Sequence, residues 1–257
     1  MASVPPRFTK NPSAFGEKLT PGDVIVKKRE DGLWNIIKIL AVDRYPDIAS
    51  GIHCLTYQFQ STKPVPEAIA NLPVMIWHAP ISANGFEDGF EVLCHDNVTS
   101  DEMKGFEEYL KHTDLARYCE FTGHDLEDLL DAAQQHYLNA NELCDQNRKL
   151  EGIEEYGKAI ELAPSFFEAI DNRSFTYMEL GDFKTALAGF DQSLIQNPQG
   201  PAAFFSRGDC LMRMGKVEEA IIVFRESAVR FPSTKQMCER SLKVIEDTRR
   251  ELDKNGH

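Results

Sequence analysis

Residues 169–198, AIDNRSFTYMELGDFKTALAGFDQSLIQNP, hold a pattern that recurs on both sides of this stretch. The repeat length is set by Pro164, Pro198 and Pro232, each 34 residues from the next. Small residues and aromatic residues return in the same register: Gly152, Ala186 and Ala220, then Tyr156, Phe190 and Phe224. A fixed period of this length is typical of stacked helix–turn–helix units, so the pattern predicts an all-α solenoid.

Each recurring position has a physical role in such a unit. The small residues allow the two helices to approach closely, and the aromatic residues fill the space between them. Gly181 and Gly215, with Asn147 in the same phase, fall where the chain turns between helices and needs a positive φ. The prolines end the second helix. Ser165 and Glu168 are spaced as a capping box that would start the next unit.

The pattern resembles the tetratricopeptide repeat (TPR) family. The resemblance implies a superhelix of three repeats, at about residues 133–166, 167–200 and 201–234, with a C-terminal capping helix. This array would occupy residues 124–257. His136 and Ile170 stand where the family prefers tryptophan, and Gly152 replaces an alanine. TPR arrays are interaction scaffolds, so the resemblance implies a protein partner.

The N-terminal half shows β patterning and resembles no family. Short apolar runs bounded by turn residues predict five strands, at residues 23–29, 34–42, 52–60, 74–78 and 90–94. They predict a small mainly-β domain over residues 22–98, an SH3-like barrel or a curled sheet. Residues 1–21 are expected to be a flexible lead-in. A helical connector over residues 99–123 would open on the capping box Thr99–Glu102. The fold class is therefore α+β.

Composition and charge restrict the partners. The net charge is −13, and no cluster of lysine and arginine resembles a phosphate-binding stripe, so neither nucleic acid nor an anionic membrane is expected as partner. The sequence has no 18-residue apolar run and no apolar signal segment at its start, which predicts no membrane span and a cytoplasmic protein. Six cysteines without a C-x-x-C pair fit a reducing compartment.

Motifs for chemistry are scarce. The sequence contains no nucleotide-binding loop, no H-E-x-x-H and no G-x-S-x-G, so no cofactor and no metal site are expected. The remaining candidates for a thiol nucleophile with a histidine base lie in the β-domain: His53, Cys54, His78, Cys94 and His95. Neighbours on a strand point to opposite faces, so Cys94 and His95 cannot converge without a second strand. We expect a protein that is not an enzyme. The alternative is an enzyme whose Cys/His β-domain does chemistry while the repeats recruit substrate.

The TPR resemblance also implies which residues face the concave groove, namely those on the first helix of each repeat. The candidate partner-binding residues are Tyr137, Asn141, Asp145, Glu168, Asp171, Asn172, Phe175, Met178, Glu179, Phe205, Asp209, Met212 and Arg213. This set contains five carboxylates, one arginine and several large apolar side chains. It suits a protein or peptide segment that is apolar and basic.

One known TPR binding mode can be compared with these residues. Co-chaperones of this family hold the acidic tails of heat-shock chaperones with two asparagines and three basic residues. Asn141 and Asn172 match the asparagines, but Tyr137, Ala202 and Ser206 occupy the basic positions. An acidic tail would be repelled, so the sequence predicts an adaptor for a basic segment, such as a bacterial immunity or assembly factor. A self-associating scaffold is a third interpretation.

Overall fold

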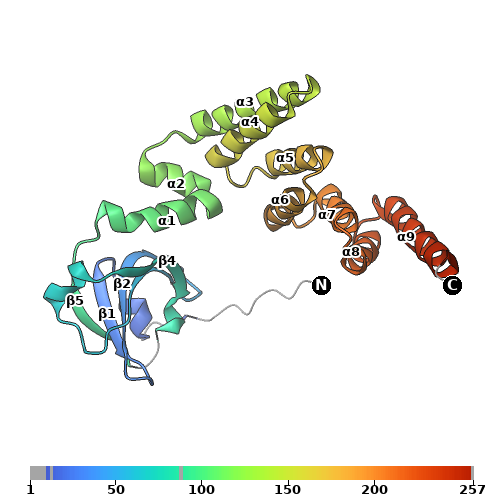
Figure 1. The fold of residues 1–257 in the computed structure, drawn as a ribbon. Coiled ribbons are helices and arrows are strands. Elements are labelled where there is room, and N and C mark those ends of the chain that lie inside the picture. The colour runs from blue at the N-terminus through green and yellow to red at the C-terminus, as the bar shows by residue number, and fades with distance from the viewer. Residues whose placement is uncertain (1–9, 12–13, 87–88, 256–257) are drawn as a thin grey trace. The chain divides into compact units, whose positions relative to one another are not determined.

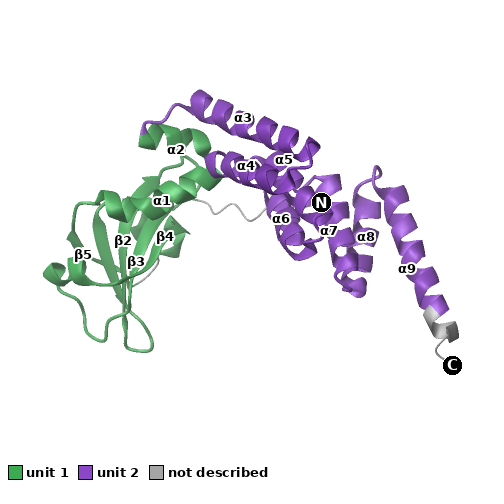
Figure 2. Cartoon of the chain, turned by 45° about the horizontal axis from the view of Figure 1, so that its top comes forward, with its two compact units in different colours: residues 1–122 green, residues 123–257 purple. Residues whose placement is uncertain are grey.

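The computed structural model describes residues 10–11, 14–86 and 89–255. The chain divides into two compact units, Met1–Thr122 and Gly123–His257 (Figure 2). The lead-in predicted for residues 1–21 lies outside the described residues over 1–9 and 12–13. The rest of it includes a 3₁₀ helix, η1 (Phe15–Lys18), and Leu19 is buried in the first unit.

The first unit is built on one five-stranded antiparallel sheet (Figure 1). The strands run in the order β4-β3-β2-β1-β5 across the sheet. Their bounds are β1 (Asp23–Lys28), β2 (Trp34–Asp43), β3 (Gly51–Tyr57), β4 (Val74–Ser82) and β5 (Glu91–His95). All five overlap the apolar runs, bounded by turn residues, that predicted strands. Strands β4 and β5 are the two edges, and no ladder joins them among the described residues, which makes this a curled sheet rather than a closed barrel.

Successive side chains of a strand point to opposite faces, and each face of this sheet carries an apolar cluster. On one face Val24, Ile36 and Leu55 pack with Phe106 and Leu110 of the helix α1 (Ser100–Thr113). On the other face the cluster comes from the strands, from Leu19 and from the chain around 3₁₀ helix η3 (Ala83–Gly85). A further 3₁₀ helix, η2 (Pro66–Asn71), adds Ile69 to the first cluster. The helix α2 (Leu115–Thr122) follows α1 after one residue.

The second unit is an array of antiparallel helix pairs. The first helices of the pairs, called A helices here, are α3 (Leu126–Asp145), α5 (Phe167–Glu179) and α7 (Pro201–Arg213). The second helices, called B helices, are α4 (Lys149–Leu162), α6 (Phe183–Gln196) and α8 (Val217–Arg230). Helix α9 (Lys235–Asn255) packs on α8 at the C-terminal end (Figure 1). This arrangement confirms the α+β class and the predicted solenoid.

The recurring residues act as the sequence predicted. Asn147, Gly181 and Gly215 turn the chain between paired helices at φ of 61°, 82° and 77°. Gly208 lies so close to Phe224 that an added Cβ would come within 2.7 Å of its ring. The close approach of the A helix to the B helix therefore leaves no room for a side chain at Gly208.

The two predicted capping boxes have different outcomes. At Thr99 and Glu102 both hydrogen bonds of the box form and start α1, as predicted. The box predicted at Ser165 and Glu168 was wrong. Helix α5 instead begins after Phe166, without a side-chain cap, because the chain from Pro164 makes a turn that ends one residue later than the spacing implied.

Candidate functional site on the A helices

The predicted partner-binding residues lie on α3, α5 and α7, as the resemblance implied, but they differ in exposure. Asp145, Glu168, Glu179 and Arg213 are exposed. The others are half-buried: Tyr137, Asn141, Asp171, Asn172, Phe175, Met178, Phe205, Asp209 and Met212. Several of the half-buried members also contact neighbouring helices of the array.

The two asparagines that match the co-chaperone pattern are bonded to each other. Asn172 Nδ2 on α5 donates to Asn141 Oδ1 on α3 over 3.2 Å, and to the hydroxyl of Tyr137 over 3.0 Å. The hydroxyl of Tyr156, on the B helix α4, donates to the same Asn141 oxygen over 2.6 Å. Burial raises the pKa of Tyr156 far above its usual range, so this phenol remains a donor. The network ties the first two A helices together.

The large apolar residues of the site pack partly against the B helices. Phe175 makes an edge contact with Phe190, with ring centroids 5.0 Å apart, and Phe205 contacts Phe224 at 5.4 Å. Met178 and Met212 pack against the same clusters. Each of these side chains leaves part of its surface exposed. They can therefore contact a partner without a rearrangement of the helices.

The carboxylates divide into paired and unpaired groups. Glu179 lies 3.0 Å from Lys149 Nζ, and Asp209 accepts a hydrogen bond from Arg213 Nε at 3.0 Å. The Arg213 guanidinium also lies over the ring of Phe183. By contrast, Asp145 and Glu168 form no ion pair with a cation in the described part of the chain. These two exposed carboxylates are available to a cationic partner.

Asp171 does not fit the simple groove interpretation. Its Oδ1 atom is buried and has no hydrogen-bond partner among the described residues. Burial raises the pKa of Asp171, the hydroxyl of Ser193 opposes that shift, and the nearby charge of Glu168 adds to it. Ser193 lies on the B helix α6, so this carboxyl is part of the packing within the repeat. A lysine at this position would disturb the fold as well as the surface.

In the sheet unit, two of the candidate histidines do meet. His53 Nδ1 on β3 and His78 Nε2 on β4 are 2.9 Å apart, and His53 Nε2 lies 3.0 Å from Asp43 Oδ2. Arg117 of α2 donates to both oxygens of Asp43, which lowers the pKa of that carboxyl. Burial and the charge of His53 lower the pKa of His78 to about 4. The chain of bonds holds both imidazoles beneath Phe106 and Tyr109 of α1.

The candidate cysteines do not join this histidine pair. Cys54 packs in the cluster on the opposite face of the sheet, where burial raises its pKa to about 12. Cys94 packs against the α1 side of the sheet, and burial raises its pKa too. His95 is exposed and contacts Asp23 instead. Neither thiol therefore pairs with one of the candidate histidines among the described residues, and a raised pKa leaves a thiol a poor nucleophile at neutral pH.

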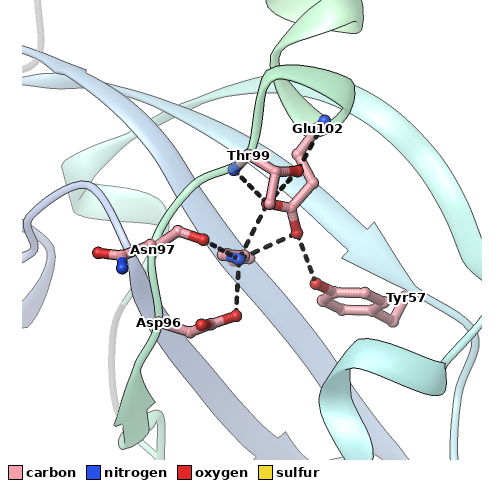
Figure 3. Close-up of polar contacts among 6 residues, drawn as sticks. Tyr57, Asp96, Asn97, Thr99 and Glu102 are labelled. Atoms are coloured by element: carbon pink, nitrogen blue, oxygen red, sulfur yellow. Dashed lines mark hydrogen bonds and ion pairs between the residues drawn. The ribbon is translucent and has the colours of Figure 1, made fainter.

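A buried lysine forms a polar centre that no sequence pattern indicated. The side chain of Lys38 on β2 is 1% exposed, yet its amine donates to Asp96, to the carbonyl of Asn97 and to both oxygens of Glu102. Asp96, Asn97 and Glu102 surround this amine, while Tyr57 and Thr99 bond to Glu102 (Figure 3). Glu102 is also the residue that caps α1. The partners of Lys38 lie 58 to 64 residues away from it in the sequence, so no local pattern indicates these contacts.

The described residues show neither a metal-binding cluster nor a membrane-spanning helix. No group of three or more histidine, cysteine or acidic side chains there is arranged to hold a metal ion. Within the same residues, no helix is both long enough and apolar enough to cross a membrane.

Residues 176–233 match the family model of the tetratricopeptide repeat. The match confirms the predicted resemblance over these residues, and it includes no residue of the sheet unit. No curated protein sequence matches the chain.

Three solved structures illustrate the similarity. The Arabidopsis OM64 TPR domain is 20% identical over 45% of this chain and 97% of that one, with a TM-score of 0.42. The second TPR domain of human RPAP3, in complex with the HSP70 peptide SGPTIEEVD, is 20% identical over 47% and 97%, with a TM-score of 0.42. The Sgt2 TPR domain of Aspergillus fumigatus is 17% identical over 46% and 82%, also at 0.42.

Proposed function

Since the C-terminal half is a tetratricopeptide-repeat array, we propose that this protein is a non-catalytic adaptor that binds an apolar and basic protein segment on its A-helix face. The observation that carries the proposal is that aromatic side chains and carboxylates lie together on that face. Half-exposed Tyr137, Phe175 and Phe205 alternate with exposed carboxylates such as Asp145 and Glu168. Aromatic side chains with free surface supply affinity, and the carboxylates orient a cationic partner and speed its association.

The same face argues against an acidic tail as the partner, which is what the HSP70 peptide in the RPAP3 structure is. The positions that would hold its carboxylates are Tyr137, Ala202 and Ser206, none of which is cationic. Asn141 and Asn172 are already bonded to each other. Carboxylates such as Glu168 would add repulsion.

The proposed setting follows from the charge and the thiols. A chain with a net charge of −13 suits the neutralisation of a basic protein, as in a bacterial immunity or assembly factor. We place it in the cytoplasm because all six cysteines are free thiols, which a reducing compartment maintains.

The test is affinity capture from the native cell lysate with charge-reversed chains. The test variant carries Asp145→Lys and Glu168→Lys, both at exposed positions on A helices. The control carries Glu161→Lys and Glu226→Lys, equally exposed but on B helices, with the same change in net charge. We expect the wild type and the control to recover the same partner and the test variant to lose it. Equal recovery by all three chains would refute the A-helix face as the binding surface.

A further inference from the structure

A cavity of about 430 Å³ opens between α3 and the turn that leads into α5. The large apolar side chains in its lining are Leu130 on α3 and Phe166 and Phe167 at the start of α5. Ala133 and Ala163 also line it, and both are buried. A volume of this size lies at the lower end of the range of about 300–1,000 Å³ that ligand pockets occupy. The cavity can hold one large apolar side chain with part of its backbone.

The exposure of Leu130 distinguishes this cavity from ordinary packing. The leucine is 46% exposed, although it lies in α3 only three residues before the buried Ala133. A large apolar residue at the mouth of an apolar cavity gains free energy when a partner covers it.

Acidic side chains border the same cavity. Asp131 and Glu168 line it, both are exposed, and neither forms an ion pair with a cation in the described residues. The charge of Glu168 is also felt at Asp171, whose pKa it helps to raise. The field at the cavity mouth is therefore negative, and it favours a cation next to whatever apolar group enters.

We propose that this cavity receives the anchoring side chain of the bound segment, a leucine, phenylalanine or methionine with a lysine or arginine next to it. The proposal rests on the proposed function and names the part of the A-helix face that binds the anchoring side chain of the partner. The apolar side chain fills the space between Leu130 and Phe167 and excludes water there. The neighbouring cation lies against Glu168 and Asp131, which sets the direction of the segment.

The test uses two fluorescent ten-residue peptides and the full chain. In one peptide leucine and phenylalanine alternate with lysine, and in the other glutamate replaces every lysine. By fluorescence anisotropy we expect the wild type to bind the lysine peptide at least about tenfold more tightly than the glutamate peptide. Gln134→Trp places a large ring at the cavity lining and should weaken lysine-peptide binding about tenfold or more.

Matched variants separate the cavity from general effects. Gln135→Trp adds the same ring at the next position of α3, which is exposed and does not line the cavity, so it should leave the affinity unchanged. Glu168→Lys should weaken the lysine peptide and reduce its salt dependence, whereas Glu161→Lys should do neither.

The outcomes distinguish the two proposals. If the lysine peptide binds the wild type and Gln134→Trp equally, the cavity is not the anchor, while the adaptor proposal stands. If the wild type binds the glutamate peptide as tightly as the lysine peptide, the proposal that a cation lies next to the anchoring side chain is refuted. If neither peptide binds the wild type, both the cavity proposal and the proposed preference for apolar, basic segments are overturned.

Discussion

At the scale of single residues, Lys38 couples the sheet to the helix that covers it. Its amine is buried and bonded to Asp96 and Glu102, and Glu102 in turn caps α1. Removal of one partner from a buried ion pair leaves the other charge uncompensated, which typically costs about 3–5 kcal/mol. Because Glu102 is 16% exposed and Asp96 is 52% exposed, we expect Lys38→Met to lower the free energy of unfolding toward the lower end of this range in urea denaturation.

The control for this prediction is an exposed pair on the same helix. Lys104 and Asp101 on α1 contact each other at 2.7 Å, with more than two thirds of each side chain exposed, so Lys104→Met should change stability little. The double variant Lys38→Met with Glu102→Gln should recover part of the loss, since it leaves no buried carboxylate charge. If Lys38→Met were as mild as Lys104→Met, the buried network would have no energetic role.

His78 makes the sheet unit sensitive to acid. Its pKa in the folded chain is about 4, against an ordinary value of 6.5, so the unfolded chain binds the proton first as the pH falls. The contribution of neutral His78 is complete above pH 6.5 and is lost between pH 6.5 and 4. It amounts to at most about 3 kcal/mol for a shift of this size. Asp43 stays charged through this window because Arg117 lowers its pKa.

The measurement is the free energy of unfolding of the sheet unit at several pH values between 7 and 4, followed by the fluorescence of its tryptophans. We expect the slope in this window to decrease in His78→Gln, which cannot take up a proton. His95→Gln is the control, since His95 is exposed and lies outside the pair. A slope unchanged in His78→Gln would show that other groups cause the acid sensitivity.

The residue scale is also where sequence reasoning was weakest. Resemblance placed Asn141 and Asn172 on facing A helices, but it did not indicate that their amides bond to each other. It assigned Asp171 to the groove, although the structure turns this carboxyl toward Ser193. Lys38 and its partners are joined only by the three-dimensional fold. Such details depend on which side chains meet across the tertiary structure, and the spacing of residues along one helix or strand does not determine that.

At the scale of elements, the turn between paired helices is set by backbone conformation. Gly215 has φ of 77°, which a residue with a Cβ adopts only with strain, so Gly215→Ala should destabilise the array by about 1 kcal/mol. Gly157 lies inside α4 with nothing near its missing Cβ, so Gly157→Ala should stabilise it by about 0.5–1 kcal/mol. Thermal unfolding checks both. The same sign for the two changes would contradict the assigned conformations.

Most elements could be predicted because their causes are local. The five strands followed from short apolar runs bounded by turn residues, and the helix pairs followed from prolines and small residues at a fixed period. The wrong capping box at Ser165 shows the limit of such reasoning. Thr99 and Ser165 have the same spacing to a glutamate, but Thr99 is the extended residue that precedes its helix, whereas α5 begins after Phe166, one residue beyond Ser165.

At the scale of the whole molecule, the two compact units carry different features. The array carries the half-exposed aromatics, the unpaired carboxylates and the cavity. The sheet unit carries a buried lysine network and a histidine pair that stabilise its own packing. We accordingly propose that the array alone recognises the partner.

The most direct measurement of this claim is affinity capture from the native lysate with the full chain and with residues 123–257, which form one compact unit. Circular dichroism would first confirm that the isolated segment is helical. We predict that both chains recover the same partner with similar affinity. Recovery by the full chain alone, with the segment folded, would contradict the central claim, because the binding surface would then require the sheet unit.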